Sequence, residues 1–79
     1  MNIDLLVKMA NDISAFFAAE SAPEQAANDV ASHLRRFWEP RMRRQIITHL
    51  EQHQGAGLDE LARRAVAVLA AQAGAGAGK

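Results

Sequence analysis

Apolar residues recur at steps of three and four along nearly the whole chain, a spacing typical of amphipathic helices. The pattern predicts a first helix from about Ile3 to Ala19, which Asn2 or Asp4 can cap. The apolar face of this helix is predicted to consist of Leu6, Met9, Ala10, Ile13, Phe16 and Phe17. We expect this face to lie against the core.

A second helix is predicted to begin near Ser21. The residues from Ser21 to Glu24 fit a capping box, with Pro23 in the first turn. The predicted apolar face contains Ala27, Val30, Ala31, Leu34, Phe37 and, at its end, Trp38 as a further candidate.

A third helix is predicted from Pro40 to about His53, with Met42, Ile46 and Leu50 buried and Ile47 at the edge. The sequence Gly55-Ala56-Gly57 ends it, because glycine tolerates the left-handed backbone that follows many helices. A fourth helix is predicted from about Leu58 to Ala71. Its apolar stripe contains Leu61, Ala62, Ala65, Val66 and Leu69.

These segments predict an all-α fold, a small bundle of about four short helices without a sheet. We expect residues 1–72 to form the helical domain. Residues 73–79 alternate glycine with alanine before the final lysine, which is typical of a flexible low-complexity tail.

Charge is balanced overall but unevenly placed. The 79 residues carry nine Lys and Arg against nine Asp and Glu, yet residues 1–34 hold one lysine and five carboxylates. Residues 35–44 hold five arginines and one glutamate. Dedicated nucleic-acid binders usually show a larger basic excess. No apolar run approaches the ~18 residues of a membrane span, and no signal peptide is recognisable, so we expect a soluble cytoplasmic protein.

The run from His33 to Arg44 stands out, because it combines the five arginines with the single tryptophan and Pro40. Proline disfavours helical geometry at the residue before it and suits the start of a helix, so a corner is predicted near Trp38. Tryptophan and arginine are enriched at binding hot spots. The residues predicted to bind a partner are Arg35, Arg36, Trp38, Arg41, Arg43 and Arg44.

Within this corner, we expect Phe37 in the core and Trp38 as the apolar anchor of an interface, since adjacent residues of a helix point about 100° apart. The alternative is a solvated face, in which Arg35 and Arg36 pair with Glu39 at helical spacing.

The sequence contains few candidates for catalytic or metal-binding residues. His49 and His53 are spaced like two metal ligands, but a third ligand is not evident. We expect His33 to be a packing or hydrogen-bonding residue. The chain lacks cysteine, and its serines and threonine occur in no catalytic motif. The sequence therefore predicts no catalytic, cofactor-binding or metal-binding residue.

Three segments together resemble a known family: Leu6 to Ile13 with the following phenylalanine pair, His33 to Arg43, and Gly55 to Leu58. In this order they are similar to the delta subunit of soluble NAD-dependent formate dehydrogenase over about residues 5–69. The arginine-aromatic-Pro-Arg-Met-Arg run is the specific part.

The resemblance implies an accessory, non-catalytic subunit that stabilises or assembles a cytoplasmic complex. That complex oxidises formate to carbon dioxide and reduces NAD. The resemblance also implies that other subunits carry a molybdenum pterin cofactor, iron–sulfur clusters and FMN, and that this chain carries no cofactor. The partner that it implies is the catalytic (alpha) subunit. Neither nucleic acid nor membrane is an expected partner. The alternative is a small nucleic-acid-binding helical module using the arginine-rich corner, whose affinity would fall steeply with salt.

Overall fold

The structure, a computed structural model, describes the backbone of residues 2–77 and the side chains of residues 2–73. It contains four helices: α1 (Ile3–Glu20), α2 (Pro23–Phe37), α3 (Pro40–His53) and α4 (Glu60–Ala77). Residues 2–77 include no strand, which confirms the all-α prediction. Helix α4 starts two residues after the predicted position and continues to Ala77, so the backbone of residues 73–77 of the predicted tail is helical. Residues 78–79 lie outside the described residues, and the mobility of the tail stays a prediction.

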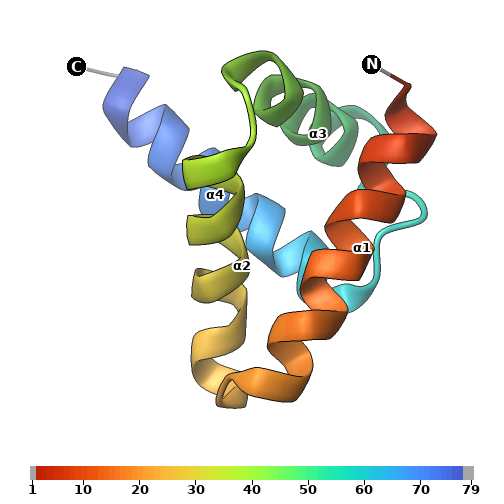
Figure 1. Cartoon of the computed structure of the whole chain (residues 1–79). Helices are drawn as coiled ribbons and strands as arrows, with labels where there is room; N and C mark the ends of the chain where they lie inside the picture. Colours follow the sequence, from red (N-terminus) through yellow and green to blue (C-terminus); the bar gives the residue numbers. More distant parts are fainter. Residues whose placement is uncertain (1, 78–79) are drawn as a thin grey trace.

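The helices are arranged around a helical hairpin. Figure 1 shows α1 and α2 meeting at the turn that joins them, with α3 across the open end of the hairpin. Helix α4 crosses behind the hairpin and makes its most extensive contact with α2. Because α1 also packs against α2, α3 and α4, the four helices share one core. None of the described helices combines the length and apolar character needed to cross a bilayer.

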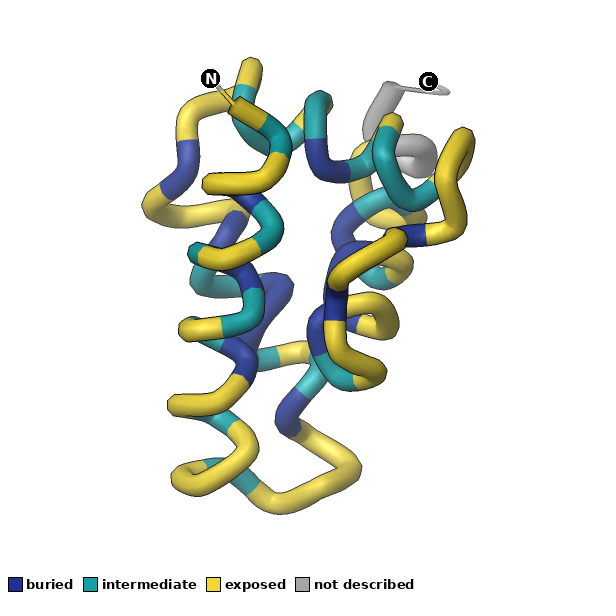
Figure 2. The backbone as a smooth tube through the Cα atoms, turned by 90° about the vertical axis from the view of Figure 1, so that its right-hand side faces the viewer, coloured by how far each residue is buried: buried dark blue, intermediate teal, exposed yellow. Residues whose placement is uncertain are grey.

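The core is formed by alanines and larger apolar residues from all four helices. The buried positions lie on the facing sides of the helices, whereas the α1–α2 turn is exposed (Figure 2). The core cluster consists of Leu6, Ala10, Val30, Ala31, Leu34, Trp38, Ile46, Leu58, Ala62, Ala65, Val66 and Leu69. The predicted stripe of α4 is confirmed. The predicted face of α1 is wrong at Phe16, which is exposed, and omits Ser14, which is buried.

A polar clamp joins α1 to the start of α4. The Asn11 amide donates to the carbonyl of Gly57 at 2.9 Å, and its oxygen accepts the backbone N–H of Asp59 at 2.9 Å. The buried Ser14 hydroxyl donates to Asp59 Oδ1 at 2.9 Å. The same carboxylate oxygen accepts the N–H of Ala62 at 2.7 Å and so caps α4. The Asp59 side chain therefore accepts hydrogen bonds from both the buried Ser14 hydroxyl and a backbone N–H in the first turn of α4.

The helix starts follow the predictions in part. Asn2 caps α1, because its Oδ1 accepts the backbone N–H of Asp4 at 2.7 Å. The predicted capping box at Ser21 is wrong. Ser21 instead ends α1, and its hydroxyl donates to Asp29 Oδ2 at 2.6 Å. Helix α2 begins after Ala22, which offers no side-chain cap.

The turn after α3 depends on glycine. Gln54 adopts left-handed backbone with φ of 57°, and Gly55 follows with φ of 70°. A Cβ atom on the buried Gly55 would lie 3.1 Å from Leu50 Cδ1. Glycine is thus required for backbone conformation and for space, which confirms the predicted end of α3.

We predict that Asp59→Ala destabilises the fold by about 2–3 kcal/mol, because it removes the α4 cap and leaves the Ser14 hydroxyl without its acceptor. Urea unfolding followed by far-ultraviolet circular dichroism measures this loss. Asp12→Ala is the matched control, since Asp12 pairs only with Lys8 on an exposed surface. Its effect should stay within about 0.5 kcal/mol. Equal effects of the two substitutions would contradict a structural role for the clamp.

Candidate functional site

The chain turns sharply between α2 and α3. Helix α2 ends at Phe37, and Trp38 and Glu39 have extended backbone with ψ of 142° and 152°. Pro40 is the first residue of α3, where its missing N–H leaves no helical hydrogen bond unmade. The predicted corner is therefore confirmed, with the change of direction confined to two residues.

The two aromatic residues of the corner have roles opposite to those predicted. Trp38 is 6% exposed and belongs to the core, whereas Phe37 is 69% exposed. The physical reason is that Trp38 has left the helix, so helical periodicity no longer determines where its side chain lies. The indole occupies the core at this end of α2, and the smaller ring of Phe37 lies outside. With its indole buried in the core, Trp38 offers a partner little surface, which argues against its predicted role as the apolar anchor of an interface.

Arg43 holds the corner together from inside. Its Nη1 donates to the carbonyl oxygen of Arg35 at 3.0 Å and to that of Trp38. Carbonyl groups at the end of a helix lack the N–H donors of a following turn, so an external donor satisfies them. Arg43 is half-buried, in keeping with this role. The structure therefore assigns to Arg43 an internal contact that its predicted role in docking did not include.

The other four arginines of the corner are exposed: Arg35, Arg36, Arg41 and Arg44. We call them the arginine face. In the part of the chain that the structure describes, none of them forms an ion pair with a carboxylate, and the proposed pairing with Glu39 is not formed. Arg35 and Arg36 lie in the last turn of α2, where cations are favourable. Arg41 lies in the first turn of α3, which has no acidic residue, and there a cation opposes the helix dipole.

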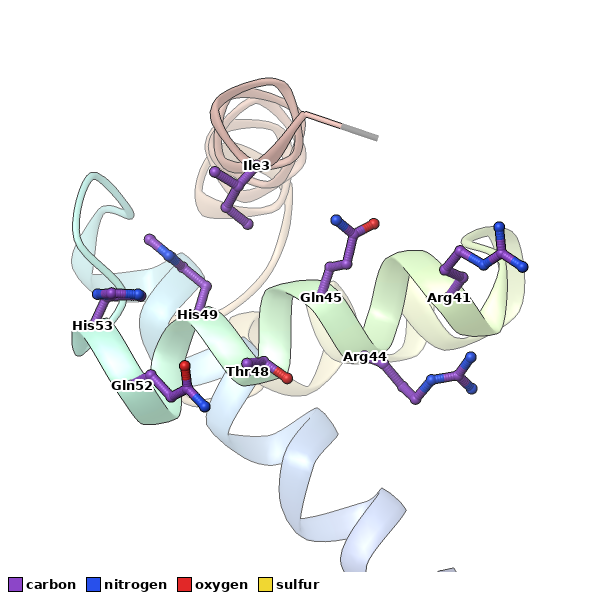
Figure 3. Close-up of a pocket in the computed structure, with 8 residues that line it drawn as sticks. All are labelled: Ile3, Arg41, Arg44, Gln45, Thr48, His49, Gln52 and His53. Carbon is purple, nitrogen blue, oxygen red and sulfur yellow. The ribbon is translucent and has the colours of Figure 1, made fainter.

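A shallow groove of about 480 Å³ extends along α3 from the arginine face. Figure 3 shows Arg41 and Arg44 at its one end, His49 and His53 at its other end, and Ile3 of α1 opposite. The described residues that line it are Ile3, Arg41, Arg44, Gln45, Thr48, His49, Gln52 and His53. No carboxylate is among these residues, so the charged groups of the groove favour an anionic or carboxylate-bearing partner.

The histidines contribute to packing and to turns. His49 Nε2 lies 2.7 Å from the carbonyl oxygen of Ala56, which ties α3 to the following turn. The rings of His49 and His53 are 5.6 Å apart between centroids. Within the described residues, no group of three or more histidine or acidic side chains could hold a metal ion. His33 packs between the rings of Phe17 and Phe37, as expected of a packing residue.

A known family matches most of the length of the chain. A family model described as NADH-dependant formate dehydrogenase delta subunit FdsD matches residues 5–66. The chain belongs to the FdsD family. A comparison with curated proteins finds no match to this chain, and neither does a comparison with solved structures.

The FdsD match covers the structural features described above. Residues 5–66 include nearly all of α1, the whole of α2 and α3, and the start of α4. The corner and the Asn11–Asp59 clamp both lie within this range. The resemblance predicted from the sequence over about residues 5–69 is thus confirmed, and the chain is the delta-subunit type of a formate dehydrogenase complex.

We predict that Trp38→Ala destabilises the chain by about 3–5 kcal/mol, because it empties a large buried site. Phe37→Ala, at the adjacent exposed position, should change the free energy of unfolding by no more than about 0.5 kcal/mol. Urea unfolding of both variants makes the comparison. A larger loss of unfolding free energy for Phe37→Ala than for Trp38→Ala would show that the core contains the Phe37 ring and not the Trp38 indole.

We also predict that Arg43→Met lowers the free energy of unfolding by about 1–2 kcal/mol, because the carbonyl groups at the end of α2 lose their donor. Methionine keeps an apolar stem of similar length, so the guanidinium is the main loss. Arg44→Met is the control, with an expected change within about 0.5 kcal/mol. Thermal unfolding of the three proteins measures the difference, and identical midpoints for the two variants would contradict it.

Proposed function

We propose that this FdsD-family chain is a non-catalytic accessory subunit that stabilises or assembles a cytoplasmic, molybdenum-containing NAD-dependent formate dehydrogenase. The family match over residues 5–66 carries the proposal, since it identifies a delta subunit of a formate dehydrogenase. In this proposal the molybdenum pterin cofactor, the iron–sulfur clusters and FMN are bound by other subunits.

The side-chain chemistry of the chain supports a role without catalysis. Without cysteine, the chain cannot hold an iron–sulfur cluster through thiolates, its usual ligands. The hydroxyl groups of Ser14 and Ser21 donate to the carboxylates of Asp59 and Asp29, which join helices. The groove along α3 is open and lined by cations, amides and histidines, a surface suited to recognition.

We further propose that the arginine face binds carboxylates on the catalytic (alpha) subunit. Its four guanidinium groups are exposed and free of ion pairs within the described residues. Arg41 is placed against the dipole of α3, an unfavourable position that a bound carboxylate would reverse. Local conflicts of this kind are expected at functional sites. Trp38 and Arg43 take part from inside, because they fix the angle at which the two arginine-bearing helix ends meet.

The test is co-expression of the tagged chain with the other formate dehydrogenase subunits. The double variant Arg41→Glu/Arg44→Glu should reduce the co-purified alpha subunit at least about tenfold, because repulsion replaces attraction across the interface. The control is Lys8→Glu/Arg64→Glu, which reverses two exposed cations on other helices and should leave co-purification intact.

Circular dichroism checks that both double variants stay helical. Full co-purification of the Arg41→Glu/Arg44→Glu variant would contradict docking through the arginine face. Failure of the unaltered chain to co-purify with any subunit would contradict the accessory role itself. In that case, steeply salt-dependent retention of nucleic acid would favour the alternative module.

A further inference from the structure

A row of aromatic rings connects α1 to α2. Phe16 and Phe17 meet edge to face with centroids 5.1 Å apart. Phe17 lies 5.9 Å from His33, and His33 lies 4.7 Å from Phe37. We call these four residues the aromatic seam. The apolar pattern of the sequence predicts its three phenylalanines on the buried faces of the helices.

The ends of the aromatic seam face solvent, with Phe16 59% exposed and Phe37 69% exposed. These are large apolar surfaces for a chain with three phenylalanines in total. The ring contacts already order the side chains, so a partner that covers them loses little additional side-chain entropy. The aromatic seam therefore has the properties of a preformed binding surface.

A depression of about 300 Å³ lies along the aromatic seam and places charged groups beside its rings. Its lining consists of Phe17, Asp29, Ser32, His33, Arg36 and Phe37. Asp29 already accepts the Ser21 hydroxyl at 2.6 Å and lies 3.5 Å from the Gln25 amide nitrogen. Arg36 forms no ion pair within the described residues. Asp29 thus has hydrogen-bond partners within the chain, whereas the Arg36 guanidinium, beside the exposed Phe37, is available to pair with a carboxylate from outside it.

We propose that the aromatic seam binds a segment of another formate dehydrogenase subunit that presents a large apolar side chain with a carboxylate within about one helical turn of it. The apolar side chain packs on Phe37 and His33, and the carboxylate pairs with Arg36. This proposal rests on the proposed function, because it takes the partner from the same complex. It adds a second contact surface that adjoins the arginine face at Arg36.

The hydrogen bonds of Asp29 argue against a second copy of this chain as the occupant. A twofold pairing of two aromatic seams would bring two Arg36 side chains into one interface. Among the described residues that line the depression, the carboxylate is Asp29, and both of its oxygens already accept hydrogen bonds from Ser21 and Gln25. An Arg36 from a second copy would have to share these acceptors, whereas a carboxylate from a different chain meets no such competition.

The test places a photo-reactive side chain in the aromatic seam of the complete complex. Phe37→benzoylphenylalanine, in a tagged chain co-expressed with the other subunits, should crosslink on irradiation to another subunit. Mass spectrometry should locate the crosslink on an apolar residue within four positions of Asp or Glu. The control is Leu5→benzoylphenylalanine, an exposed apolar position on α1 outside the aromatic seam, which should not crosslink to that segment.

Affinity supplies a second readout. Phe37→Ala and Arg36→Gln should each bind the complex assembled without this chain at least about tenfold more weakly, and Leu5→Ala should bind normally. Crosslinks only between two copies of this chain, or a segment without a carboxylate, would overturn the proposal. So would normal binding by Phe37→Ala and Arg36→Gln, with the accessory role intact. If the unaltered chain does not bind the complex, the proposed function fails as well.

Discussion

The indole of Trp38 fills the core where α2 stops, and this contact fixes the direction in which α3 leaves. Pro40 starts the new helix, so the chain turns within the two extended residues Trp38 and Glu39. Arg43 then donates to two carbonyl groups at the end of α2 and holds the corner from the α3 side. An apolar contact and a polar contact thus act on the same turn. The exposed arginines on either side of the turn are positioned by these two contacts.

Many of the remaining core residues have small side chains. Five of the buried core residues are alanines, which let the helices approach closely: Ala10, Ala26, Ala31, Ala62 and Ala65. Trp38 is the aromatic residue among the buried core residues, and Phe16 and Phe37 lie outside the core. The surface that we propose for partner binding thus includes the two phenylalanines that are exposed.

The helices were predictable because each carries a regular apolar stripe, and because Pro40 and Gly55 mark ends of α3. The corner's bias towards arginine was also visible in the sequence, as was the resemblance to the delta subunit. Periodicity does not extend past the end of a helix, so it could not place Trp38. Nor could it indicate that Arg43 reaches back across the corner while its neighbours remain exposed.

Contacts between distant residues account for the other differences. Asn11 and Asp59 meet only when α1 and α4 have packed, and local patterns carry no trace of this pairing. The Ser21 hydroxyl donates to the carboxylate of Asp29, which lies in the second turn of α2, and does not cap the start of that helix. Side-chain oxygens near a helix start have several acceptors and donors within reach once the tertiary structure forms. A capping box is thus a local preference that a tertiary contact can override.

In this structure Trp38 is internal, and we propose that a partner covers the arginine face and the aromatic seam. Hydroxyl-radical footprinting of the free chain and of the assembled formate dehydrogenase complex tests it most directly. The account predicts that Phe16 and Phe37 are oxidised in the free chain and protected in the complex. Trp38, although its indole is intrinsically reactive, should stay unmodified in both states. Strong oxidation of Trp38 in the free chain that disappears on assembly would contradict the account.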